Sequence, residues 1–149
     1  MMAPGMRLQP VEILLVEDNP VDVMMIREVF TGARVLNNLH VAEDGEEAMD
    51  FLCKRGGFST APSPEIILLD LNLPRKDGRE VLAEIKGDPS LRHIPVVVLT
   101  TSESEEDIWN SYDLQANCFV TKPMDLEQFT RALEQIGDFW FTLVRLPKT

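Results

Sequence analysis

The segment Pro64–Gly78 has the sequence PEIILLDLNLPRKDG, in which a short apolar run ends in one carboxylate, Asp70. A run that is apolar on both faces is typical of a strand covered by helices on both sides, as in a parallel sheet. Ligands of open α/β sheets bind at the carboxyl ends of the strands, which makes Asp70 a candidate functional residue. The alternative is an Asp that only starts a turn, since Pro74, Asp77 and Gly78 are turn-forming residues.

Apolar runs alternate with helical segments along the rest of the chain. The expected strands are Val11–Val16, Leu39–Ala42, Ile66–Leu69, Val96–Thr100 and Cys118–Thr121. The expected helices begin at Asn19-Pro20, where Val21, Met24, Met25 and Val29 recur at helical spacing, at Asp44-Gly45, before Val81-Leu82, at Ser104 and at Asp125. This alternation predicts an α/β fold, a flavodoxin-like doubly wound parallel sheet of five strands in the order 2-1-3-4-5, with five helices.

The composition fits one globular domain, with 149 residues of which 44% are hydrophobic and 26% are charged. The net charge of −11 argues against binding to nucleic acid or to an anionic membrane surface. We find no secretory signal and no apolar stretch long enough to cross a bilayer, so we expect a cytoplasmic protein. Cys53 and Cys118 form no CxxC pair and are expected to be small buried hydrophobes.

Three segments divide the chain. We expect a flexible arm over Met1–Pro10, the domain itself over 11–137, and an apolar extension over 138–149. The extension carries more apolar residues than one helical stripe needs, so they either fold back on the domain or bury against a second chain. We favour a homodimer interface made by Phe139, Trp140, Phe141, Leu143, Val144 and Leu146.

Polar side chains follow four of the expected strands, and the predicted strand order brings them to one edge of the sheet. They are Glu17, Asp18, Asp70, Thr100 and Lys122. Carboxylates crowded together repel one another, and a proton or a bound cation relieves the repulsion. Mg²⁺ suits one or two carboxylates with a phosphoryl oxygen, and a carboxylate can itself attack phosphorus to give an aspartyl phosphate. The predicted chemistry is therefore phosphoryl transfer to Asp70, with Lys122 and Thr100 at the phosphoryl oxygens.

These residues resemble the receiver domains of two-component response regulators, over roughly residues 11–136. The resemblance rests on the Glu17-Asp18 pair, on DLNLPRKDG from Asp70 to Gly78, on Leu99-Thr100 and on Lys122-Pro123. It implies that Asp70 accepts a phosphoryl group from a sensor histidine kinase. It also implies that the chain is a signalling protein that catalyses only its own phosphorylation and dephosphorylation.

The resemblance assigns roles to individual residues. Asp18, Asp70 and the backbone carbonyl of Asn72 would ligate Mg²⁺, with Glu17 assisting directly or through water. Lys122 would pair with the acyl phosphate, across a cis bond to Pro123. Thr100 and the aromatic residue Phe119 would form the conformational switch, and Asn72 and Ser102 would influence how fast water removes the phosphoryl group. Phe119 lacks the hydroxyl of the Tyr that many family members have, and Thr101 stands where an Ala is frequent.

The loop at 56–64, the segment 92–102 and the sequence IGDFW from Ile136 to Trp140 resemble single-domain regulators paired with phytochromes. The resemblance implies a phytochrome-type histidine kinase as partner. Because the chain ends soon after the receiver, output is expected through a partner or a downstream phosphotransfer protein.

Three other functions share parts of this pattern. A phosphatase of the haloacid dehalogenase class also uses an Asp with Mg²⁺, but it wants a second Asp two residues later, where this chain has Asn72. A flavodoxin-like FMN binder needs an anion-welcoming loop where this chain has Glu17 and Asp18. A degenerate receiver that acts only as a binding module is disfavoured by the retained acids, Thr100 and Lys122.

Overall fold

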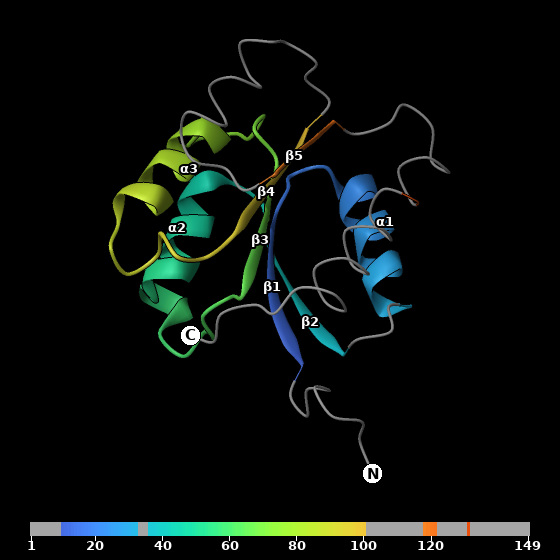
Figure 1. The fold of residues 1–149 in the computed structure, drawn as a ribbon, viewed down its shortest axis with the longest axis horizontal. Helices are drawn as coiled ribbons and strands as arrows, with labels where there is room; N and C mark the ends of the chain where they lie inside the picture. The colour runs from blue at the N-terminus through green and yellow to red at the C-terminus, as the bar shows by residue number, and fades with distance from the viewer. Residues whose placement is uncertain (1–9, 33–35, 101–117, 122–130, 132–149) are drawn as a thin grey trace.

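The computed structural model describes residues 10–32, 36–100, 118–121 and 131, with only the backbone for residues 100 and 118–121. Strands and helices alternate along the chain (Figure 1). The elements are β1 (Val11–Val16), α1 (Pro20–Thr31), β2 (Asn37–Ala42), α2 (Gly45–Cys53), the short 3₁₀ helix η1 (Gly56–Phe58), β3 (Ile66–Leu69), α3 (Gly78–Gly87), β4 (Val96–Thr100) and β5 (Cys118–Thr121).

All described strand pairs are parallel, and the order across the sheet is β2-β1-β3-β4-β5. The register pairs Val16 of β1 with Ala42 of β2 and with Leu69 of β3. Because parallel strands that end in register share one edge, residues that follow β1 and β3 come together there. The sequence-based prediction of a parallel α/β sheet is confirmed.

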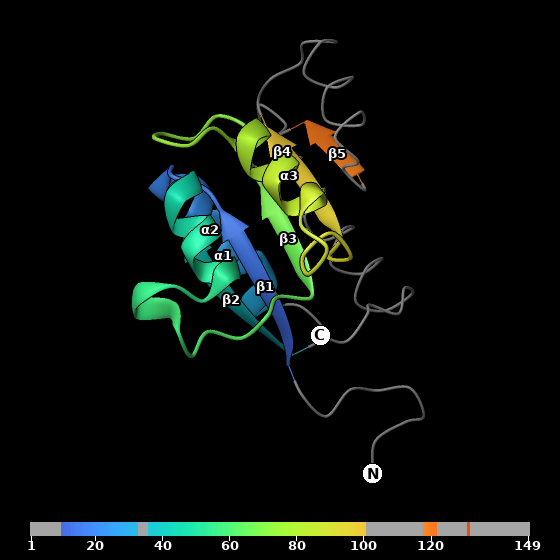
Figure 2. The ribbon, with the colours of Figure 1, turned by 90° about the vertical axis from the view of Figure 1, so that its left-hand side faces the viewer.

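Helices cover both faces of the sheet, as Figures 1 and 2 show, with α2 and α3 on one face and α1 on the other. One apolar cluster joins α2 and α3 to side chains such as Leu14, Ile67 and Val98. A second cluster joins Ile26 and Phe30 of α1 to the opposite face. Since each fully buried aliphatic side chain contributes about 1.5–3 kcal/mol, the two layers fix the strands that carry the site.

Capping residues set where the helices begin. The side chain of Asn19 accepts hydrogen bonds from the N–H groups of Val21 and Asp22 at the start of α1. The side chain of Asp44 accepts one from the N–H of Glu47 at the start of α2, at 2.8 Å. Both caps follow directly on a strand end and its short loop, so they fix how the chain leaves the carboxyl edge of the sheet.

Several predicted details are wrong or lie outside the described residues. Strand β2 begins at Asn37, two residues before the predicted start. Val21 and Met24, which helical spacing places on one stripe with Met25 and Val29, are more than half exposed on α1. Cys53 is exposed rather than buried, because it is the last residue of α2, where the helix ends. The helices predicted from Ser104 and Asp125, the N-terminal arm and the C-terminal extension lie outside the described residues.

Among the helices of the described ranges, none is both long enough and apolar enough to cross a membrane.

Candidate functional site

Three carboxylates meet at the carboxyl edge of the sheet. Glu17 and Asp18 follow β1 directly, and Asp70 follows β3. Their carboxylate oxygens lie within 4.8 Å of one another. Backbone hydrogen bonds continue past the strand ends, from the N–H of Glu17 to Ala42 O and from that of Asp70 to Val16 O, each 3.0 Å long. The sheet ladder therefore holds the two buried acids in place.

The burial of the three side chains differs in a way that suits a cation. Glu17 is 1% exposed and Asp70 is 8% exposed, whereas Asp18 is exposed to solvent. Like charges this close repel strongly, and burial weakens the screening by water. Mg²⁺ binds a few carboxylate oxygens, keeps several waters and so needs one side of its site open. The donor set and its open side fit this ion.

Asp70 is oriented by the residues that follow it. The backbone N–H of Asn72 donates a 2.9 Å hydrogen bond to Oδ1 of Asp70, a local turn typical of Asp. This bond holds one carboxylate oxygen toward the loop. Asn72 itself is exposed to solvent.

The loop after Asp70 is closed by Gly78, the first residue of α3. Its N–H donates a 3.1 Å hydrogen bond to Leu71 O. A Cβ at this position would lie 2.2 Å from Asp70 O and 2.6 Å from the Cα of Leu71. Contacts this short do not occur in folded proteins, so only glycine allows α3 to begin this close to Asp70. The sequence identified Gly78 as a turn residue but not this approach to the strand.

The remaining predicted site residues are described only in part. Thr100 is the last residue of β4 and pairs with Thr121 at the end of β5, and Phe119 pairs with Val98 inside the same ladder. Thr100 thus belongs to the same edge of the sheet by its backbone. Lys122, Ser102 and the predicted interface residues Phe139, Trp140, Phe141, Leu143, Val144 and Leu146 lie outside the described residues.

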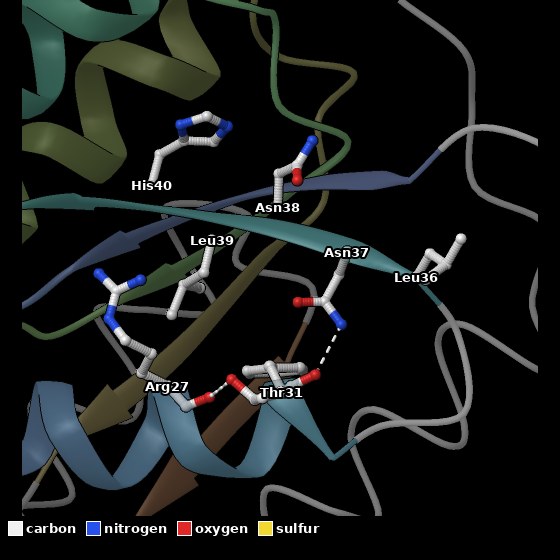
Figure 3. A pocket seen from close by; sticks show the side chains of 8 residues that line it. Arg27, Thr31, Leu36, Asn37, Asn38, Leu39 and His40 are labelled. Carbon is white, nitrogen blue, oxygen red and sulfur yellow. Dashed lines mark hydrogen bonds between the residues drawn. The ribbon is translucent and has the colours of Figure 1, made fainter.

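A hollow of about 510 Å³ lies elsewhere, between the end of α1 and the start of β2 (Figure 3). Two of its polar side chains have partners, since the Thr31 hydroxyl donates to Arg27 O and Asn37 Nδ2 donates to Phe30 O. On the other side of β2, His40 Nε2 lies 2.6 Å from Glu12 Oε2. These contacts are structural, so the carboxylate cluster is the better candidate for chemistry.

Known proteins resemble this chain over most of its length. The model of the response regulator receiver domain matches residues 13–134. Response regulator Rcp1 of Synechocystis sp. is 48% identical over 138 residues, which cover 93% of this chain and 94% of the relative. The phosphorylated cyanobacterial phytochrome response regulator RcpA has a solved structure with a TM-score of 0.91 at 48% identity, covering 94% of this chain and all of that one. The Mn²⁺-bound form of Rcp1 gives a TM-score of 0.91 at 47% identity, covering 93% and 100%.

The matched residues 13–134 take in the positions of Glu17, Asp18 and Asp70 and nearly all of the described sheet. A phosphatase of the haloacid dehalogenase class and an FMN-binding flavodoxin are accordingly set aside. This chain belongs to the response regulator receiver domain family.

Proposed function

We propose that this chain is a response regulator of a two-component system that accepts a phosphoryl group on Asp70. The observation that carries the proposal is the cluster of Glu17, Asp18 and Asp70, whose carboxylate oxygens lie within 4.8 Å at the carboxyl edge of a parallel sheet. A degenerate receiver would have no reason to keep three mutually repelling carboxylates in a largely buried site.

Mg²⁺ is the proposed cofactor. Glu17, Asp18, Asp70 and the backbone carbonyl of Asn72 would hold it, and the relative Rcp1 has been solved with Mn²⁺ bound. When bound, the ion supplies positive charge to the phosphoryl oxygens as negative charge develops on them. The protein supplies the fixed carboxylates and the closed loop that set the position of Asp70.

The proposed reaction is a transfer between phosphorus and two side chains. A carboxylate oxygen of Asp70 forms the new P–O bond, and the P–N bond of a phosphohistidine on the kinase breaks, so the imidazole leaves with the electron pair. Thr100 and Lys122 are proposed to contact the phosphoryl oxygens. Hydrolysis of the aspartyl phosphate later releases free phosphate and restores the Asp70 carboxylate. Asn72 and Ser102 are proposed to influence the rate of this hydrolysis. The protein thus promotes only its own phosphorylation and dephosphorylation.

The output is proposed to be a population shift. Once phosphorylated, Asp70 favours the conformation in which Thr100 moves toward the phosphoryl group, and Phe119 turns into the vacated space. Since Phe119 has no hydroxyl, the coupling rests on packing. A phosphotransfer protein or another partner would then distinguish the two conformations.

The proposed kinase partner is of the phytochrome type, and the proposed location is the cytoplasm. Support for the kinase comes from the 48% identity with RcpA, a cyanobacterial phytochrome response regulator. Transfer from a radiolabelled phytochrome-type histidine kinase would test the assignment. Phosphoryl transfer to this chain should be faster from the phytochrome-type kinase than from a histidine kinase of another sensor class. Equal transfer rates from the two kinases would contradict the assignment.

We further propose a receiver over residues 11–137 with the five helices of a complete flavodoxin-like fold, and a homodimer made through residues 138–149. The support is the apolar surplus of this segment, from Phe139 to Leu146. Sedimentation of a chain ending at Gly137 should give a monomer where the full chain gives a dimer. A dimer that survives the truncation would exclude this interface.

Incubation with acetyl phosphate tests the central proposal. In the presence of Mg²⁺ the intact mass should increase by one phosphoryl group, and a chelator such as EDTA should prevent the increase. A chain that gains no phosphoryl group with Mg²⁺ present would refute phosphoryl acceptance.

A further inference from the structure

We propose that Gly45, the first residue of α2, is a positioning residue for phosphoryl transfer, because its lack of a side chain lets the loop from Asp70 to Gly78 seat against α2. The inference rests on the proposed function of Asp70. Gly45 belongs to α2, whereas the loop that follows Asp70 leads into α3. The motifs in the sequence do not reveal the contact between Gly45 and this loop.

The contact is between Gly45 and the backbone of Lys76. A Cβ built on Gly45 would lie 2.2 Å from Lys76 O, 2.7 Å from its Cβ and 2.9 Å from its carbonyl carbon. Distances below 3.0 Å force a displacement. Because the three atoms belong to the backbone or are fixed directly to it, no rotation of the Lys76 side chain relieves the overlap. Either α2 or the loop has to move.

The core resists movement of α2. Its residues Ala48, Met49, Phe51 and Leu52 are buried in the apolar cluster that α2 shares with α3 and the sheet. Its first turn is capped by the side chain of Asp44, which accepts the N–H of Glu47 at 2.8 Å. Shifting the helix would disturb close packing along its whole length, whereas the loop is partly exposed. The loop is therefore the element that yields.

Charged contacts hold the same part of the loop between two helices. Nζ of Lys76 lies 2.7 and 2.8 Å from the two carboxylate oxygens of Glu84 on α3. Arg75 adopts the left-handed backbone conformation, with φ of 63°, and its guanidinium lies 3.7 Å from carboxylates of Asp44 and Glu46. The exposed pairs contribute little energy, but the left-handed residue shows that the loop follows a specific path.

The displaced loop is the one that carries the site. At its start, the N–H of Asn72 holds Oδ1 of Asp70, and at its end Gly78 is bonded to Leu71. Both ends of the loop are hydrogen-bonded to Asp70 or Leu71. A shift at Lys76 is therefore passed along the loop to the short segment that follows Asp70. That segment includes the carbonyl of Asn72, the proposed Mg²⁺ ligand.

The test is Gly45→Ala in the full chain. The Mg²⁺ dissociation constant, measured by calorimetric titration, should rise, and phosphorylation of Asp70 by acetyl phosphate should slow by roughly 10- to 100-fold, as a misplacement near 1 Å does in other sites. Gly87→Ala is the matched control, since a Cβ at Gly87 meets nothing within 4 Å and both glycines are at the end of a helix. It should leave both values unchanged.

A second control separates positioning from simple loss of stability. Leu52→Ala removes a buried side chain of α2 about two turns along the helix from Gly45, so it should destabilise the fold while keeping Mg²⁺ affinity within about twofold, as expected for two-state folding well below the unfolding transition. The double variant combines Gly45→Ala with Lys76→Gly. It lacks the Cβ of residue 76, and the glycine there lets the neighbouring peptide rotate away from the new methyl group at residue 45. Mg²⁺ affinity should recover in part.

The outcomes are distinct. If wild type accepts phosphate and Gly45→Ala binds Mg²⁺ and reacts like wild type, the positioning role is wrong although the proposed function stands. If wild type is not phosphorylated, the proposed function fails and the inference with it. Should Gly45→Ala not fold, a double variant that folds supports the contact. A double variant that also fails to fold, while Lys76→Gly alone folds, overturns it.

Discussion

The N–H of Gly78 donates a 3.1 Å hydrogen bond to the carbonyl oxygen of Leu71, so α3 begins against the peptide that follows Asp70. The helix and the phosphoryl-accepting strand therefore meet backbone to backbone, without an intervening side chain. Such an arrangement ties the geometry of Asp70 to the position of a helix that packs in the core.

Gly78→Ala is predicted to destabilise the protein and to weaken Mg²⁺ binding. The added Cβ would fall 2.2 Å from Asp70 O, and overpacking of this kind costs about 1–3 kcal/mol in the free energy of unfolding. Urea denaturation measures the loss. Gly87→Ala, which adds a methyl group in open space, should change the free energy of unfolding by less than about 0.5 kcal/mol. Equal effects of the two substitutions would contradict the close contact.

Asp18→Asn is predicted to raise the thermal stability of the metal-free protein and to reduce the stability that the protein gains from Mg²⁺. Without Mg²⁺, the variant should melt at a higher temperature than wild type, because one of three repelling carboxylates is neutral. With Mg²⁺, wild type should gain more stability than the variant, since binding to the folded state stabilises it. The Mg²⁺ dissociation constant of Asp18→Asn should rise by at least roughly 10- to 100-fold. This is the loss in affinity when a group that only supports a metal ligand is removed, and Asp18 is proposed to be a ligand itself.

Melting curves at several Mg²⁺ concentrations measure both effects of Asp18→Asn. Glu80→Gln is the control, because it removes one negative charge from the first turn of α3 without touching the carboxylate cluster. A variant at Asp18 whose melting temperature responds to Mg²⁺ as wild type does would show that Asp18 is not a ligand.

Lys86→Met is predicted to destabilise the protein by about 1 kcal/mol through lost hydrogen bonds. Nζ of Lys86 donates to Arg92 O at 3.1 Å and to Ile94 O at 2.9 Å, just before β4. Lys54→Met, at an exposed lysine, is the control and should be close to neutral.

The stabilising effect of Lys86 should also depend on pH. Burial lowers the pKa of Lys86 in the folded protein below its ordinary value of 10.5. Between the two values the unfolded chain binds more protons, so the free energy of unfolding rises with pH in that window. The difference between wild type and Lys86→Met should therefore grow as the pH rises toward 10.5. A constant difference would indicate that the lysine is not desolvated.

The carboxylate cluster could be predicted from the sequence because it depends only on strand order. Once β1 and β3 are recognised as buried parallel strands, the residues after them must share one edge, and Glu17, Asp18 and Asp70 do so. Strand bounds were also close, since β-branched and aliphatic runs end sharply at polar residues.

Packing between elements could not be predicted in the same way. Helix α1 is apolar on more than one side, so helical spacing alone did not distinguish the buried Ile26 and Phe30 from the exposed Val21 and Met24. Gly45 carries no signal in the sequence beyond that of a helix start, because its role depends on Lys76, a residue that reaches it only through the fold.

The most direct test of the account compares Asp70→Asn with Asp77→Asn, a nearby acid of the same loop that lies outside the carboxylate cluster. Each protein is incubated with acetyl phosphate and Mg²⁺, and its intact mass is measured. Wild type and Asp77→Asn should each gain one phosphoryl group, and Asp70→Asn should gain none. A phosphoryl group that still appears in Asp70→Asn, at the wild-type rate, would contradict the assignment of Asp70 as the acceptor.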